Sequence, residues 1–192
     1  MKSENHERRD GIARNFLLVA LVMGLVLATD QIAKSLILNR LGPTGDLTQI
    51  KIIPGFLRLI YVENTGAAFG MFQGRSPVLT VLALVVIGFL IVYFRRSIAQ
   101  SVWLASALGL QLGGALGNVI DRLRHGFVVD FVNVPHFPTF NVADSAITIG
   151  VIMLGFYLLT SDTTTSASDE RTLGVSVAKQ PVENPAAEKR AQ

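Results

Sequence analysis

Four apolar segments constrain the fold of this chain more than any other feature of its sequence. Each approaches the length of about 20 residues that an α-helix needs to cross the hydrocarbon core of a bilayer. Half of the residues are hydrophobic and only 16% are charged, so the chain is poor in the charges that cover a water-soluble surface. We therefore expect one membrane domain over residues 15–160, an all-α bundle of four transmembrane helices at about 16–36, 78–94, 102–120 and 142–159.

Two polar segments flank this domain. Residues 1–14 form a leader that contains several cations, and residues 161–192 are rich in Ser, Thr, Ala, Pro and charge, a composition typical of a disordered tail. A cleaved signal peptide also begins with cations and an apolar run. That alternative is disfavoured here, because the apolar run continues past any plausible cleavage site into a patterned segment.

The segment between the first two spans, residues 37–77, is expected to lie outside the membrane. Within it, β-branched and aromatic residues on both sides of Pro54-Gly55 indicate two short strands joined by a turn. A glycine-rich turn follows at 64–66, and Ala67–Gln73 is predicted to form a short helix at the membrane interface. A second external region covers residues 121–141.

An even number of spans places both termini on one side of the membrane. The basic leader and Arg95-Arg96 favour the cytoplasm for that side, since cytoplasmic loops carry an excess of Lys and Arg. The opposing loops also contain cations, so charge alone supports this orientation only weakly. In either orientation, four acidic residues fall at the face opposite the termini: Asp30, Asp121, Asp130 and Asp144.

The third span differs from the others because small residues recur at every fourth position. Such a stripe allows close contact between membrane helices, so we expect this span to pack tightly against a neighbour. The stripe consists of Ala105, Gly109, Gly113 and Gly117.

Two of the four acids admit a catalytic interpretation. Asp144 follows Asn141 by three residues at the start of the fourth span, where an Asn N-cap and an acid in the first turn both stabilise a helix. Asp130 lies among apolar neighbours, which raise a carboxyl pKa, although an isolated charge on an edge strand is an alternative. Two carboxyl groups that share one proton form an acid–base couple able to activate water.

Other polar residues near the third span have structural interpretations. Asp121 and Arg122 are expected to satisfy loop carbonyls and one another, while the Asn118 amide could orient a substrate carbonyl or a catalytic acid. Asp30 and Lys34 are spaced to pair on one helix face. In that pair Lys34 either snorkels to the interface or acts as the base for a serine.

Several other chemistries are disfavoured. The chain has no cysteine, which rules out disulfides and thiol catalysis. A serine nucleophile at Ser145, with Lys34 or His136, lacks a distinctive motif around it. His125 and His136 match no zinc spacing, so we expect neither a metal nor a cofactor. The cations are scattered without interleaved aromatic residues, so a nucleic-acid partner is not expected.

Five sequence blocks nevertheless occur in a recognisable order. They are DQIAK, ENTGAAFG, GGALGNVIDR, VVDFV and FNVADSAI, at residues 30–34, 63–70, 113–122, 128–132 and 140–147. No single block is decisive, but five in order on four predicted spans are specific. Together they closely resemble lipoprotein signal peptidase, the signal peptidase II family of bacterial inner-membrane aspartic peptidases. The resemblance covers the chain from Asp30 to Leu159.

The resemblance implies a fold, a reaction and a location. The fold would be a four-span bundle with a small extracytoplasmic β-sheet cradle and a short interfacial helix. The reaction would be removal of the signal peptide from diacylglyceryl-modified prolipoproteins, by a cut before the lipid-modified cysteine. The protein would lie among the lipids of the bacterial inner membrane with both termini in the cytoplasm and its active site at the outer leaflet edge, acting as a monomer.

The resemblance also implies which residues form the site. The catalytic dyad would be Asp130 and Asp144. The remaining site residues would bind substrate or support the dyad: Asn64, Gly66, Asn118, Arg122, Asn141, Asp30, Lys34 and Asp121.

Two rival classes remain to be weighed. A small ion- or proton-coupled transporter would relay ions through membrane carboxylates, but its acids should spread through the depth of the bilayer. A non-enzymatic scaffold would use the small-residue stripe for assembly, but it leaves Asp130 unexplained.

Overall fold

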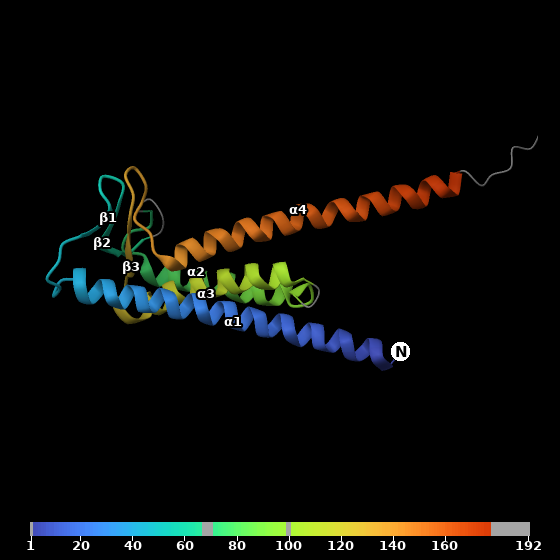
Figure 1. Cartoon of the computed structure of the whole chain (residues 1–192), viewed down its shortest axis with the longest axis horizontal. Coiled ribbons are helices and arrows are strands. Elements are labelled where there is room, and N and C mark those ends of the chain that lie inside the picture. The colour runs from blue at the N-terminus through green and yellow to red at the C-terminus, as the bar shows by residue number, and fades with distance from the viewer. Residues whose placement is uncertain (1, 67–70, 99–100, 178–192) are drawn as a thin grey trace, which may run out of the picture. The chain divides into compact units, whose positions relative to one another are not determined.

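The structure is a computed structural model that describes residues 2–66, 71–98 and 101–177. Figure 1 shows the elements in chain order: α1 (Lys2–Leu41), β1 (Ile50–Ile53), β2 (Leu57–Asn64), α2 (Ser76–Phe94), α3 (Val102–His125), β3 (Val128–Asn133) and α4 (Val142–Val177). Met1–Leu154 forms one compact unit and Gly155–Gln192 a second.

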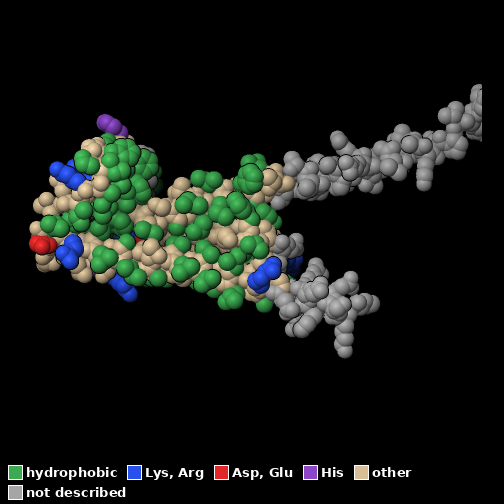
Figure 2. Space-filling model, viewed as in Figure 1, with side chains coloured by type: hydrophobic (Ala, Val, Ile, Leu, Met, Phe, Trp, Pro, Cys, Tyr) green, Lys and Arg blue, Asp and Glu red, His purple; other side chains and the backbone are tan. Residues whose placement is uncertain are grey.

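Four helices among the described residues are long and apolar enough to cross a membrane: Gly11–Leu41, Ser76–Phe94, Val102–His125 and Val142–Thr160. They correspond to the four predicted spans, so the expected architecture is confirmed. In the most apolar stretch of α3, 67% of residues are buried, against 11% in α1 and in α2, which makes α3 the central helix. On the face shown in Figure 2, hydrophobic side chains are spread along the helices, as expected of surfaces that face lipid.

Two helices extend beyond the predicted spans. α1 begins at Lys2, within the predicted polar leader, and continues to Leu41. The fourth candidate span ends at Thr160, close to the predicted 159, but helix α4 itself continues to Val177, where we predicted a disordered tail from 161. Neither proline nor glycine occurs from 156 to 173, so no residue there forces the helix to stop. The rest of the predicted tail, 178–192, lies outside the described residues.

The three strands form one antiparallel sheet in the order β1-β2-β3. The predicted hairpin is confirmed: β1 and β2 are joined at Pro54-Gly55, where Gly55 has a φ of 77° that glycine adopts without steric cost. An edge strand at Asp130 was only an alternative in the sequence and its partner was not predicted; β3 forms the edge of the sheet, pairs with β2 and places Asp130 opposite Val62. The sheet packs against the end of α1 through a cluster formed by Ile37, Leu41, Val129 and Phe131.

The small-residue stripe of α3 packs against α1, as expected. A Cβ atom at Gly109 would lie 2.8 Å from the Cβ of Val22, and one at Gly117 would lie 2.5 Å from Oδ2 of Asp30. Real Cβ atoms do not approach other atoms so closely, so these glycines set the separation of the two helices. The contact at Gly117 brings the polar end of α3 next to Asp30.

The predicted interfacial helix at Ala67–Gln73 falls mostly outside the described residues, which stop at Gly66 and resume at Met71. The described residues 71–74 form turns. α2 then begins at Ser76 with a proline in its first turn, where a missing N–H is tolerated.

Candidate active site

The first candidate acid, Asp130, lies in β3 between Val129 and Phe131 and is only 2% exposed. Its Oδ1 accepts a hydrogen bond of 2.7 Å from Nδ2 of Asn141, and its Oδ2 accepts one of 2.8 Å from Nδ2 of Asn64. Asn64 ends β2, whereas Asn141 precedes α4. A buried carboxyl group is therefore held by amides from two different elements.

The second candidate acid, Asp144, lies in the first turn of α4. Oδ1 of Asn141 accepts the N–H of Asp144 at 2.9 Å, while Oδ2 of Asp144 accepts the N–H of Asn141 at 3.2 Å. This reciprocal pair is a capping box, so the capping role that the sequence indicated is confirmed. The other carboxylate oxygen of Asp144 accepts a bond of 2.9 Å from Nδ2 of Asn118. Asp144 therefore caps its helix and also takes part in the polar cluster.

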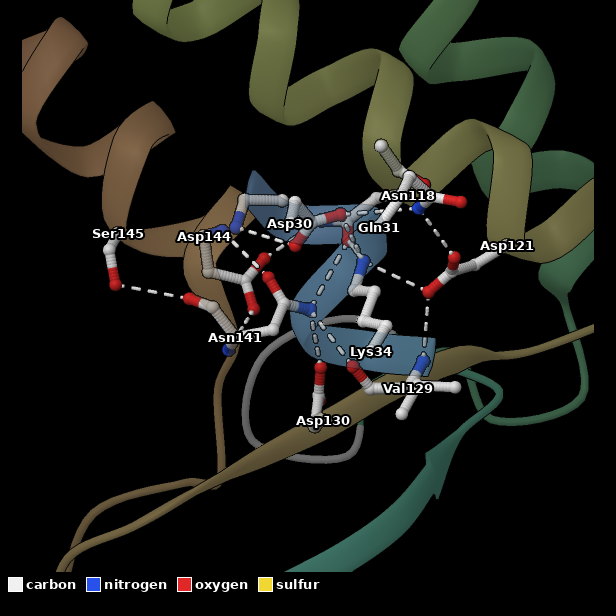
Figure 3. Close-up of polar contacts among 12 residues, drawn as sticks. Asp30, Gln31, Lys34, Asn118, Asp121, Val129, Asp130, Asn141, Asp144 and Ser145 are labelled. Carbon is white, nitrogen blue, oxygen red and sulfur yellow. Dashed lines mark hydrogen bonds and ion pairs between the residues drawn. The ribbon is translucent and has the colours of Figure 1, made fainter. Parts of the chain in front are cut away.

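Asn141 links the two aspartates, as Figure 3 shows. Its Nδ2 donates to Asp130 and its Oδ1 accepts from the backbone of Asp144. The side chain is fully buried, at 0% exposed. Both the NH2 group and the oxygen of this rigid amide are thus hydrogen-bonded, which fixes the position of one aspartate relative to the other.

The other two amides at the site also have a fixed orientation. Oδ1 of Asn64 accepts the N–H of Gly66 at 2.9 Å, and Oδ1 of Asn118 accepts from Nζ of Lys34 at 2.9 Å. Because each oxygen already faces a donor, each NH2 group must point at its carboxylate. The amides present donors, and not acceptors, to the two aspartates.

Burial, followed by the negative charge of Asp144, raises the pKa of Asp130 from its usual 3.8 to about 6. Hydrogen bonds from Asn64 and Asn141, and the charge of Lys34, act in the opposite direction and offset only part of this increase in pKa. The raised pKa expected from the apolar neighbours of Asp130 is confirmed. Asp130 is therefore a carboxyl group that can hold a proton close to neutral pH.

Both aspartates line one cavity of about 560 Å³. Two carboxyl groups with unlike surroundings in a common cavity are an arrangement that can run acid–base chemistry. Much of the remaining lining is apolar, and this part consists of Val128, Phe137, Pro138, Phe140, Ile147 and Ile149.

Arg122, near the end of α3, also lines this cavity. Its Nη2 donates to the carbonyl oxygen of Gly66 at 3.0 Å, as we expected of a residue that satisfies a loop carbonyl. Its buried Nε has no partner among the described residues. Asp121, which we expected to pair with Arg122, instead accepts the N–H of Val129 at 3.1 Å. Arg122 thus lies on the cavity lining and holds the loop at Gly66, while its buried Nε is left without a partner.

A buried charge cluster lies beside the dyad and joins α1 to α3 (Figure 3). Nζ of Lys34 lies 2.8 Å from Oδ2 of Asp30 and 2.9 Å from Oδ2 of Asp121. The same ammonium donates to Asn118. Asp30 in turn accepts the backbone N–H of Ala143 at 3.0 Å, so the cluster also reaches the start of α4.

The predicted pair of Asp30 and Lys34 is confirmed, but the interpretation that Lys34 snorkels to the interface is wrong. Lys34 is 3% exposed, because Asp121 and Asn118 on α3 complete its set of acceptors and compensate for burial of its charge. We also missed Gln31, whose Nε2 donates to Oδ1 of Asp121 at 3.0 Å. The sequence did offer a signal for Gln31: it is a polar residue next to Asp30, in addition to Lys34, within an otherwise apolar span.

Comparisons with known proteins identify the family. Residues 22–160, most of the chain, match the family model described as signal peptidase (SPase) II. The chain belongs to the signal peptidase II family. The matched residues contain every candidate site residue from Asp30 to Asp144.

Relatives in the family are similar over most of their length. The lipoprotein signal peptidase of Thermodesulfovibrio yellowstonii is 47% identical over 135 residues, which cover 67% of this chain and 86% of the relative. That of Halothermothrix orenii is 40% identical over 141 residues, covering 73% and 94%. A solved bacterial membrane enzyme has the same fold, with a TM-score of 0.68 and 34% identity over 76% of this chain and 90% of its own. The resemblance seen in the sequence is confirmed.

Membership of the signal peptidase II family decides among the classes weighed above. A peptidase family accounts for the two acids in one cavity, which neither the transporter nor the scaffold explains. The serine alternatives gain no support from the geometry: Oγ of Ser145 donates to the carbonyl oxygen of Asn141 at 3.0 Å, Lys34 contacts Asp30, Asp121 and Asn118, and His136 is exposed. Within the described part of the chain, no group of three or more His, Cys, Asp and Glu residues is arranged to hold a metal ion.

Proposed function

We propose that this chain is an aspartic endopeptidase that removes the signal peptide from diacylglyceryl-modified prolipoproteins, cutting just before the lipid-modified cysteine. The proposal is carried by one observation: Asp130 and Asp144 line a common cavity and are linked through Asn141. The relatives named lipoprotein signal peptidases support the substrate class.

The two aspartates differ in ways that suit opposite tasks. Asp130 is buried and has a pKa of about 6, so it is the member of the dyad that holds the proton. Asp144 accepts N–H groups from the side chain of Asn118 and from the backbone of Asn141 just before α4, and a helix N-terminus stabilises negative charge. Asp144 therefore acts as the base and Asp130 as the acid.

The reaction then follows from these charges. The carboxylate of Asp144 takes a proton from water, and the oxygen of that water attacks the carbonyl carbon of the scissile peptide bond. The O–H of Asp130 donates to the carbonyl oxygen and stabilises the charge that develops there. The C–N bond breaks as Asp144 passes the proton that it took from water to the leaving amine of the cysteine, which leaves the signal peptide with a new carboxyl terminus and returns Asp144 to its carboxylate form.

The surroundings of the dyad suit a lipid-bearing peptide. The apolar side chains of Phe137, Phe140 and Ile147 offer a wall for acyl chains, and the guanidinium of Arg122 adds a positive charge to the same lining. The scissile segment must unwind to react, because a helical peptide bond is shielded by its own hydrogen bonds.

We place the protein in the bacterial inner membrane, with both termini in the cytoplasm and the dyad at the edge of the outer leaflet. Asp144 lies in the first turn of the fourth candidate span, and β3 with Asp130 follows the end of α3 at His125. A membrane-inserted signal peptide would meet the dyad at that depth. Membrane lipids are then its surroundings, and we expect the protein to act as a monomer.

The proposal is tested with purified protein in lipid bilayers. Given a lipidated prolipoprotein and, separately, its unlipidated form, the protein should cut only the first, with mass spectrometry locating the cut before the cysteine. Asp130→Asn and Asp144→Asn should each lower the rate by several orders of magnitude, because one half of the acid–base couple is lost.

Asp46→Asn provides the matched control. Asp46 is an exposed acid between α1 and β1, outside the lining of the cavity. The same Asp-to-Asn change there should leave cleavage at the wild-type rate. Wild-type turnover by either dyad variant would refute the assigned mechanism, and cleavage of both substrate forms alike would refute the substrate class.

A further inference from the structure

We propose that Lys34 is a positioning residue that holds the catalytic Asp144 in place through the side chain of Asn118. The inference rests on the proposed function, since it assigns a role in the same reaction. Lys34 lies on α1, Asn118 on α3 and Asp144 on α4, so the chain of contacts crosses three helices (Figure 3).

The ammonium of Lys34 is fully engaged. Its three acceptors are Oδ2 of Asp30 at 2.8 Å, Oδ2 of Asp121 at 2.9 Å and Oδ1 of Asn118 at 2.9 Å. An ammonium has three donors and no acceptor, so none of its donors remains for substrate. A group that is 3% exposed and saturated in this way is not itself placed to touch the scissile bond.

The contact of Lys34 determines which way the amide of Asn118 points. In the observed orientation Oδ1 faces the ammonium and Nδ2 donates to Oδ1 of Asp144 at 2.9 Å. A flipped amide would set its NH2 group against the ammonium and its oxygen against the carboxylate, so both contacts would become repulsive. Without Lys34, only Asn141, which donates to Oδ1 of Asn118 at 3.2 Å, still opposes the flip from that side.

A second path from the same ammonium reaches the backbone of α4. Asp30, which pairs with Lys34, accepts the N–H of Ala143 at 3.0 Å. That N–H is one of the donors that a helix N-terminus leaves without an intrahelical partner. Asp144 is the next residue, so Asp30 holds the backbone immediately before Asp144 while Asn118 holds the carboxylate of Asp144.

A merely structural role would have different consequences. If Lys34 served only to neutralise buried acids, then a variant with the same net charge in the cluster should work as well as the wild type. One cation and two carboxylates give the cluster of Lys34, Asp30 and Asp121 a net charge of −1. The double variant Asp30→Asn/Lys34→Met leaves one carboxylate and no cation, also −1. The amide that Asp30→Asn introduces still has an oxygen that can accept the N–H of Ala143.

The double variant therefore decides between the two roles. Lys34→Met alone would leave two buried carboxylates without a cation and would risk unfolding, so the charge-matched comparison is between the double variant and the wild type, and Asp30→Asn alone measures what the loss of Asp30 contributes. We expect the double variant to lose about 100-fold in kcat relative to the wild type and most of that loss to be absent from Asp30→Asn, with KM for the lipidated substrate little changed. Adding Asn118→Ala should lower kcat in the Asp30→Asn background and add little once Lys34 is gone.

Circular dichroism and thermal unfolding in the same detergent verify that the compared variants are folded. Lys51→Met is the matched control, since Lys51 is an exposed lysine on β1 outside the cavity lining, and it should keep the wild-type kcat. Equal kcat values for Asp30→Asn and the double variant would overturn the inference, as would an equal cost of Asn118→Ala in both backgrounds. The wild type is assayed first, before any variant is compared. If it fails to cleave lipidated prolipoprotein, the proposed function is refuted instead.

Discussion

At the scale of single residues, the acid role proposed for Asp130 comes with a cost in stability. Its pKa is about 6 in the folded protein, against the usual 3.8. Between about pH 4 and 6 the folded protein holds a proton that the unfolded chain has lost, so the free energy of unfolding falls as the pH rises through this window. The full decrease from this one group is about 3 kcal/mol. The stability contributed by the protonated group is thus present below about pH 4 and lost above about pH 6.

Asp130→Asn should remove this dependence, because the variant has no carboxyl group to ionise at that position. Chemical unfolding of the detergent-solubilised protein at several pH values between 4 and 7 measures the difference between wild type and variant. We expect the variant to gain stability relative to the wild type as the pH rises, while it loses cleavage activity. Parallel pH profiles for the two proteins would show that Asp130 is not the group that titrates there.

At the scale of elements, the contact between α1 and α3 sets the geometry of the buried charge cluster. Gly117→Ala would place a methyl group 2.5 Å from Oδ2 of Asp30, so the helices must separate or Asp30 must move. Such overpacking typically costs about 1–3 kcal/mol. We expect a lower midpoint in thermal unfolding and a lower cleavage rate, since Asp30 also holds the start of α4.

Gly88→Ala on α2 is the control for this substitution. A Cβ atom at Gly88 would meet nothing within 4 Å, and alanine favours a helix over glycine. Its unfolding midpoint should match or exceed that of the wild type. Equal effects of the two substitutions would mean that the close approach at Gly117 does not set the separation of α1 and α3.

The secondary-structure elements also show how much of the fold could be predicted from the sequence alone. The spans and the β1–β2 hairpin were predictable because each depends on residues close together in the chain, such as the apolar runs and Pro54-Gly55. The pairing of β3 with β2 joins residues more than 60 positions apart, for which periodicity gives no signal. The burial of Lys34 was missed for the same reason, since its acceptors Asp121 and Asn118 lie on another helix.

At the scale of the whole molecule, the residues of the candidate site lie toward one end of the spanning helices or in the strands and loops at that end. α1 ends in the sheet-bearing region, α3 ends just before β3, and α4 begins just after it. A bundle with an apolar exterior can carry buried charges at such an end because they are paired with one another there. The site therefore works only if that end faces the compartment in which the substrate presents its scissile bond.

The side of the membrane on which this end lies can be determined with single cysteines, because the chain has none of its own. Asp46 is exposed between α1 and β1, at the sheet end, and Arg96 is exposed just after α2, which crosses from that end to the other. With the proposed orientation, a membrane-impermeant maleimide should label Asp46→Cys in intact cells and Arg96→Cys only after lysis. Retained cleavage activity by both variants would show that the labelled proteins are folded. The reverse pattern would place the dyad at the cytoplasmic face, where a signal peptide awaiting cleavage after export does not present its cysteine.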